Sequence, residues 1–379
     1  MNLRFSVWQA AALLAGTTIG SGILGVPYAI ARSGLLPGLG YVFGLGGAML
    51  LLNMLFATVV EETEDVKQLP GYVSHYLGSR LRWLMIVTLL VLGYGALTAY
   101  TAGSGAALAD IFNVSPVFTR LTFLLAAGIC VAIGVKTVSK LELFLVILIT
   151  LLIGGVGILA LSHTSFTFPD VSSDGNTAQA LLAPYGVVLF AYLGFSSIPE
   201  LRMTLRQTPD AIYCAVFTGT ILPVVLYTIF VLAVLGLTGS DTTRVATIGL
   251  GEALGPTVAI AGNLFAVLAM FTSFLALALV VKNMFELDLH LDSTRSVLLT
   301  FLPPILILSL GGDDFISILG VTGAISGGTM GILIVLMFIK IKNLQQKPWP
   351  LSTWLLSGGG IFLIGLLLLG MVVELFTTL

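Results

Sequence analysis

The sequence predicts an all-α protein that crosses a membrane many times. Hydrophobic residues make up 57% of the 379 residues, charged residues make up only 9%, and the mean hydropathy is +1.08. A soluble domain usually carries about 25% charged residues. A membrane-spanning helix needs about 20 mostly apolar residues, and such segments recur along the chain without leaving room for a soluble domain. The whole chain, residues 1–379, is therefore expected to form one membrane domain.

Eleven transmembrane helices are expected. They lie near residues 6–31, 36–60, 82–109, 117–136, 139–161, 177–204, 211–237, 254–281, 296–310, 315–340 and 352–376. With a cytoplasmic N-terminus, every one of the 16 Lys and Arg residues except Arg32, Arg120 and Arg244 lies on the inner side. Cytoplasmic loops are enriched in these residues. We therefore expect an integral protein of a prokaryotic-type cell (inner) membrane, with the N-terminus in the cytoplasm and the C-terminus outside.

The first span is interrupted in its middle. Glycines and hydroxyl residues are concentrated between Gly16 and Gly25, and Pro27 follows. In hydrocarbon, an unwound turn survives only where protein, water or a ligand satisfies its backbone groups. Half-helix N-termini attract anions and freed carbonyls attract cations. The alternative, that glycines only let helices pack closely, is preferred for isolated runs such as Gly154–Gly157, whereas the first-span cluster predicts a binding site.

A second interruption lies in the sixth span, from Tyr192 to Glu200, and contains Gly194, two serines and Pro199. Paired interruptions in corresponding positions of two halves point to a transporter's binding site. Because the breaks are five spans apart, the halves would have opposite membrane orientation. We therefore expect inverted repeats at 1–163 (helices 1–5) and 164–343 (helices 6–10), with an extra eleventh helix in 344–379.

The segment Gly16–Ala29 resembles the first-helix signature of the amino acid–polyamine–organocation superfamily. Its ending, Val26-Pro27-Tyr28-Ala29, is most similar to the amino acid/auxin permease and hydroxy/aromatic amino acid permease branches. The resemblance implies a LeuT-type 5+5 inverted repeat with discontinuous helices 1 and 6. It further implies secondary active import of neutral amino acids by cation symport, through alternating access of a bundle of spans one, two, six and seven against a scaffold.

The resemblance also implies a substrate site at the two breaks. Backbone amides near Ser21 and Gly22 would receive the substrate carboxylate, and carbonyls around Gly194 would receive its ammonium group. Bulky neighbours suggest an apolar or aromatic substrate side chain, although each of them fits a packing role as well. The expected substrate-binding residues are Thr18, Gly20, Ser21, Gly22, Tyr100, Phe190, Tyr192, Gly194, Phe195 and Ser196.

In the eighth span, Ala269-Met270-Phe271-Thr272-Ser273 resembles the Ala-x-x-Thr-Ser sodium site of sodium-coupled LeuT-fold transporters. Two hydroxyls and three carbonyls would then hold Na⁺, from Gly16, Ile19, Ala269, Thr272 and Ser273. Alternatively, Thr and Ser serve only as hydrogen-bonding groups between helices. Apart from this coupling ion, no cofactor is expected.

Proton coupling is the main alternative to sodium. Ionisable residues inside a membrane mark proton relays and ion paths, but the centres of the predicted spans hold none. The acidic residues Glu61, Glu142, Glu200, Glu252 and Glu374 all lie near helix ends. Glu61 and Glu200 remain as peripheral proton sites, although for Glu200 we favour an interfacial pair with Arg202 or Arg206.

Two other classes of function compete with transport. A sensor would bind an amino acid without moving it, and a long cytoplasmic extension would favour that reading. An intramembrane enzyme would need paired carboxylates, a His cluster or a Ser–His arrangement at membrane depth, and no such pattern is present in the sequence. We therefore expect no enzyme. The expected partners are a small amino acid and the lipid bilayer, with no nucleic acid and no obligate protein partner.

Overall fold

The computed structural model describes residues 3–133, 178–205, 211–288, 290–344 and 353–378, together with Thr208 and single positions between 148 and 158. Within these residues every regular element is a helix. The predicted fifth span, 139–161, lies mostly outside the described residues, as does the boundary between the two predicted repeats at 163/164. The division into repeats therefore stays a prediction.

Among the described residues, seven helical segments are long and apolar enough to cross a membrane, and a bent pair makes up to eight. The bent pair is Ser6–Thr18 with Ser21–Ser33, at an angle of 50°. Two shorter apolar helices, Pro116–Ala132 and Ser293–Ser309, correspond to the fourth and ninth predicted spans. An integral membrane protein with several spans is confirmed, whereas the count of eleven stays a prediction.

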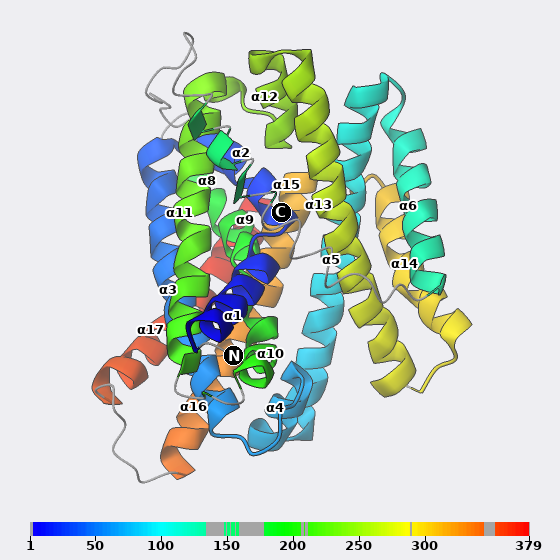
Figure 1. Cartoon of the computed structure of the whole chain (residues 1–379). Coiled ribbons are helices and arrows are strands. Elements are labelled where there is room, and N and C mark those ends of the chain that lie inside the picture. Colours follow the sequence, from blue (N-terminus) through cyan, green and yellow to red (C-terminus); the bar gives the residue numbers. More distant parts are fainter. Residues whose placement is uncertain are drawn as a thin grey trace.

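Figure 1 shows the arrangement of the described helices. The bounds are α1 Leu3–Thr18, η1 Ser21–Leu24, α2 Val26–Ser33, α3 Leu35–Glu61, α4 Leu69–Leu77, α5 Ser79–Phe112, α6 Pro116–Ile133, α8 Ala178–Leu182, α9 Pro184–Ala191, η2 Phe195–Ser197, α10 Ile198–Thr204, α11 Ile212–Thr238, η4 Gly239–Asp241, α12 Ala246–Leu254, α13 Pro256–Asn283, η5 Met284–Asp288, α14 Ser293–Ser309, α15 Phe315–Thr322, η6 Gly323–Gly327, α16 Gly328–Leu344 and α17 Thr353–Thr378.

Two groups of helices meet around the broken ones (Figure 1). In one group, α11 packs against α1, α3 and α10, and α9 packs against α2 and α3. In the other group, α5 packs against α6, α13 and α14. The first group contains the spans that were expected to form a bundle, so the four predicted bundle spans do pack together.

Local sequence explains where both broken helices resume. Pro27 lies in the first turn of α2 and Pro199 in the first turn of α10. A proline is tolerated there because the first amides of a helix have no partner within the helix. Pro184 has the same place in α9. Three of the four half-helices around the breaks therefore begin at a proline, which limits how far each helix can extend.

Candidate functional site

The first break confirms the predicted interruption. α1 ends at Thr18, and Ile19 N–H still donates to Ala15 O at 2.7 Å. The next amide, Gly20 N–H, donates instead to Thr18 O at 2.8 Å. Helical hydrogen bonding would have paired that amide with the Gly16 carbonyl. The break therefore frees backbone groups in the middle of the span, as the glycine cluster predicted.

The second break is also confirmed. α9 ends at Ala191, and Gly194 N–H donates to Tyr192 O at 2.9 Å. The Ser197 hydroxyl donates to Gly194 O at 2.9 Å, and α10 then begins at Ile198. Gly194 O also accepts from the Ser197 backbone N–H at 3.2 Å, so one serine satisfies the carbonyl at the break.

The two breaks lie against each other. Thr17 Oγ1 is 2.9 Å from Ser197 Oγ, which links α1 to η2 by a hydrogen bond. A β-carbon built on Gly194 would collide with the Thr18 hydroxyl. One built on Gly22 would lie 2.8 Å from Ala191 Cα. Gly22 is therefore needed because the backbone of α9 approaches it closely, and Gly194 because the Thr18 side chain fills the space beside it.

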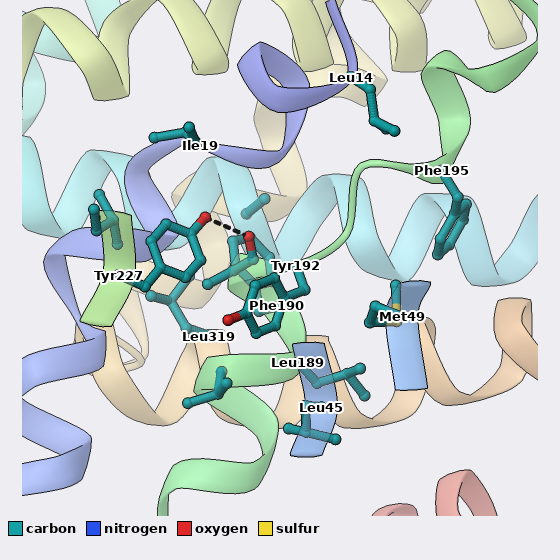
Figure 2. Close-up of a cluster of buried hydrophobic side chains, with 14 of the residues drawn as sticks. Leu14, Ile19, Leu45, Met49, Leu189, Phe190, Tyr192, Phe195, Tyr227 and Leu319 are labelled. Atoms are coloured by element: carbon teal, nitrogen blue, oxygen red, sulfur yellow. Dashed lines mark hydrogen bonds between the residues drawn. The ribbon is translucent and has the colours of Figure 1, made fainter. Parts of the chain in front are cut away.

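Tyr227 of α11 joins the ends of both half-helices. Its hydroxyl lies 2.8 Å from Thr18 O and 2.7 Å from Ala191 O, which are the last residues of α1 and α9. Figure 2 shows Tyr227 beside Tyr192, and the ring centroids are 5.1 Å apart. Sequence reasoning missed Tyr227, Thr17 and Ser197. The available signal was a tyrosine in the middle of an apolar span, since a buried phenol usually finds a hydrogen-bond partner.

Three predicted substrate-binding residues come together beside the first break. Tyr100 of α5 and Phe190 of α9 are buried, with ring centroids 6.4 Å apart in an edge-on arrangement. The Tyr100 side chain faces the Ser21 hydroxyl. Ser21 is fully buried, and its oxygen completes no hydrogen bond within the described part of the chain. The arrangement offers an aromatic wall next to an unused hydroxyl and the amides of η1.

Tyr192, Phe195 and Ser196 of the second break were also predicted to bind the substrate. The Tyr192 hydroxyl donates to Val42 O of α3 at 3.0 Å, so its ring points into the packed bundle. Phe195 belongs to the buried cluster drawn in Figure 2. Ser196 is exposed. Direct contact of these three residues with a substrate stays a prediction.

The eighth span places a hydroxyl opposite the first break. A β-carbon built on Gly20 would lie 3.6 Å from Ser273 Oγ. Thr272 is buried, and its hydroxyl lies 3.1 Å from the carbonyls of Leu268 and Ala269 in its own helix. A hydroxyl that donates its proton to a carbonyl keeps lone pairs for a cation. The predicted sodium ligands thus lie on two facing elements, with Ala269, Thr272 and Ser273 on α13 and Gly16 and Ile19 at the end of α1.

Arg202, one of the two predicted partners of Glu200, makes its contacts with other residues. Arg202 donates to Val60 O at 2.7 Å and to Thr63 O, and its Nε lies 3.9 Å from Glu61 Oε1. Arg202 therefore ties α10 to the end of α3 and pairs with Glu61, while Glu200 is exposed. Arg206, the other predicted partner of Glu200, lies outside the described residues.

Sequence comparison identifies related proteins along the whole chain. The profile of the tryptophan/tyrosine permease family matches residues 4–377. "Tyrosine-specific transport system 1" of Haemophilus influenzae is 27% identical over 392 residues, covering 96% of this chain and 94% of the relative. "Glutamine transporter 2" of Aliivibrio fischeri is 24% identical over 389 residues, covering 97% and 99%. "Tryptophan-specific transport protein" of H. influenzae is 26% identical over 395 residues, covering 96% and 93%.

Solved structures share the fold at low identity. MhsT in complex with L-phenylalanine has a TM-score of 0.64 and 15% identity, covering 100% of this chain and 99% of MhsT. Mhp1, a nucleobase-cation-symport-1 family transporter in a closed conformation with bromovinylhydantoin bound, has a TM-score of 0.63 and 14% identity, covering 98% and 92%. These similarities extend across the chain and include both broken helices.

Proposed function

Because the chain belongs to the tryptophan/tyrosine permease family, we propose that it is a secondary transporter that imports a neutral L-amino acid with an apolar or aromatic side chain. The family consists of permeases, so the chain is an integral membrane transporter and not an enzyme. The observation that carries the substrate class is the buried pair of Tyr100 and Phe190 beside the hydroxyl of Ser21. Relatives named for tyrosine, tryptophan and glutamine transport support a neutral substrate.

In this proposal the substrate zwitterion lies across the two breaks. Its carboxylate is received by the backbone amides of Ser21 and Gly22, at the start of the outer half of the first span. Exposed amides there attract anions, and glycine lets the ligand approach the backbone. Its ammonium group is received by the carbonyls around Gly194, with Ser196 nearby. Thr18 and Gly20 complete the turn, and the side chain lies against Tyr100 and Phe190.

We further propose that Na⁺ drives uptake. The ligands are the carbonyls of Gly16, Ile19 and Ala269 and the hydroxyls of Thr272 and Ser273. Hard cations prefer oxygen ligands of this kind. The approach of Ser273 to Gly20 supports the proposal, because it puts α13 opposite the freed carbonyls of α1. Proton symport and substrate sensing without transport are the alternatives that the experiment must separate.

Uptake into proteoliposomes tests the function and the ion together. We expect labelled tyrosine, tryptophan or phenylalanine to accumulate when an inward Na⁺ gradient is applied, and to equilibrate without accumulation when K⁺ or choline replaces Na⁺ at equal ionic strength. Accumulation driven only by a pH gradient would make the protein a proton symporter. Binding in detergent without any uptake would make it a sensor.

A further inference from the structure

One carboxylate is buried inside the helical core. Of the acidic side chains that the structure describes, only Glu374 is buried, with 6% of its surface exposed. It lies on α17, within the apolar segment Gly358–Phe376. Carboxylates inside membrane proteins are costly to bury and are usually functional. The sequence placed Glu374 near a helix end and assigned it no role, so its burial calls for an explanation.

The Glu374 carboxylate lies where three helices meet. It accepts a hydrogen bond from the backbone N–H of Gly186 in α9. A β-carbon built on Gly320 of α15 would collide with Glu374 Oε1. A β-carbon built on Gly370 of α17 would collide with the ring of Tyr185. Gly320 thus makes room for the carboxylate and Gly370 for the tyrosine at the crossing of α9, α15 and α17.

Two tyrosines are among the titratable groups near this carboxylate. α17 packs against α3, α8, α9, α15, η6 and α16. Tyr41 of α3 and Tyr185 of α9 interact with Glu374 electrostatically. The sequences of α8, α15 and η6 contain no titratable side chain. Lys340 and Lys342 of α16 lie near its C-terminal end, whereas Gly328 at its start contacts α17 one turn from Glu374.

The carboxylate supplies a cap that α9 lacks in its own sequence. The N-cap residue of α9 is Ala183, which makes no side-chain hydrogen bond to the helix. Gly186 lies in the first turn, where amides have no partner within the helix. A carboxylate at this end of a helix stabilises those amides and the positive end of the helix dipole. Ionised Glu374 therefore holds the start of α9 against α17.

The opposite end of α9 is the candidate substrate site. α9 has eight residues and is therefore about 12 Å long. Its last residues are Phe190, which faces Tyr100, and Ala191, which contacts Gly22 and Tyr227. Gly323 contacts both Gly186 O and Phe190, so the start and end of α9 share one neighbour. One short helix therefore connects the surroundings of Glu374 with the candidate substrate site.

We propose that Glu374 is a proton-binding site whose ionised form locks α9 to α15 and α17 and whose protonation releases it, so that transport accelerates at acid external pH. The inference rests on the proposed transport function. α9 belongs to the group of helices that would move, whereas α15 and α17 lie outside that group. Protonation removes the charge that favours the helix N-terminus and so weakens the contact between Glu374 and the first turn of α9.

The pH profile of uptake tests the proposal. At saturating Na⁺, uptake by the parent should rise as external pH falls, by at least about fivefold, the lower end of typical coupling between sites. Glu374→Gln mimics the protonated side chain and should give a flat profile near the parent's acid rate. Glu374→Asp keeps a titratable group and should restore part of the pH dependence. Glu252→Gln removes an exposed carboxylate on α12 and is the matched control with the parent's profile.

Two further measurements keep the outcomes distinct. The carboxylic C=O band in infrared difference spectra of the parent should appear on acidification and be absent in Glu374→Gln, whether or not transport is intact. If Glu374→Gln does not remain monodisperse, Tyr185→Phe serves as a second variant, because loss of the neighbouring phenol should shift the midpoint of the parent's pH profile. Active Glu374→Gln protein with the parent's pH profile would overturn this inference and leave the transport function standing. A parent that transports no amino acid under any gradient would overturn the transport function.

Discussion

Gly20 and Gly22 lack side chains for different reasons, although only Ser21 separates them. A β-carbon on Gly22 would press on the backbone of Ala191 at 2.8 Å. A β-carbon on Gly20 would meet only Ser273 Oγ, at an ordinary contact distance of 3.6 Å. Gly22 is therefore required by the packing of the two broken helices. Gly20 has room for a side chain in the protein alone, which suits a position that a ligand approaches.

The two glycines give a matched pair of variants. Gly22→Ala should lower the free energy of unfolding by about 1–3 kcal/mol, as overpacking usually does. Gly20→Ala should keep the parent's thermal stability but weaken substrate binding by about tenfold, or about 1.4 kcal/mol, because the methyl group occupies the space between α1 and α13. Thermal unfolding and equilibrium binding in detergent measure both effects. Parent affinity in stable Gly20→Ala protein would place the ligand elsewhere.

The hydroxyls of Thr272 and Ser273 determine the ion response in our proposal. Substituting both by alanine leaves a cation with three carbonyl ligands in an apolar surround, so Na⁺ should bind more weakly. Because ion and substrate share the first break, Na⁺ should tighten amino acid binding to the parent by roughly 5- to 150-fold, the usual range of such coupling. The double variant should lose most of this gain in a titration of substrate against Na⁺.

Thr300→Ala is the control for that titration. Thr300 is a buried threonine on α14 whose hydroxyl donates to Ser296 O of its own helix at 2.7 Å. Its loss should leave the sodium response unchanged. If substrate binding to the parent does not respond to Na⁺ at all, the two α13 hydroxyls serve helix packing and the ion proposal is wrong.

At the scale of elements, the broken helices are held by groups from other helices. The Tyr227 hydroxyl of α11 hydrogen-bonds the carbonyls of the last residues of both α1 and α9. Arg202 connects α10 to two carbonyls at the end of α3. Thr17 and Ser197 connect the two breaks directly. An unwound segment at membrane depth persists because its polar groups find partners within the protein.

Tyr227→Phe tests how much the shared hydroxyl contributes. Removing it leaves two buried carbonyls without this donor, so we expect a loss of about 1–3 kcal/mol in stability together with weaker substrate binding. Tyr94→Phe is the control, because the Tyr94 hydroxyl bonds Leu299 O between α5 and α14 at 3.1 Å. It should lower stability without changing substrate affinity. Equal affinity in both variants would show that Tyr227 only stabilises the fold.

At the scale of the whole molecule, helices of the bundle are in contact with helices outside it. α9 is in contact with α3 on one side and with α15 on another. The C-terminal part of α17 comes to lie beside α9 and α15 (Figure 1). The extra helix of the sequence prediction is thus in contact with a broken helix. A movement of the bundle would have to change these contacts.

The orientation of the chain stays a prediction from the basic residues and is open to direct labelling. Asp65, between α3 and α4, and Ser240, after α11, are exposed. In a background without Cys130 and Cys214, Ser240→Cys should react with a membrane-impermeant thiol reagent in intact cells. Asp65→Cys should react only after the membrane is made permeable. The reverse pattern would invert the whole topology, since both positions depend on the same count of spans.

The sequence alone determined the membrane class, the helical spans and the positions of both breaks. These follow from local properties, because hydropathy over about 20 residues predicts a span, and glycine with proline marks where a helix stops and resumes. The family resemblance also grouped Tyr100, Phe190 and Ser21, which are neighbours in the structure, while their contact with a substrate stays a prediction. Most of the fifth span and the repeat boundary lie outside the described residues.

Only the tertiary structure decided which side chains hydrogen-bond the backbone groups at the two breaks. Tyr227 meets Thr18 and Ala191 across long sequence separations, and the Glu374 carboxylate meets α9 and α15 from two other parts of the chain. Helices that are apolar on every side carry no periodic pattern to show which face is packed. The direction of a tyrosine, and the burial of a carboxylate near a helix end, therefore depend on how the helices are rotated against one another.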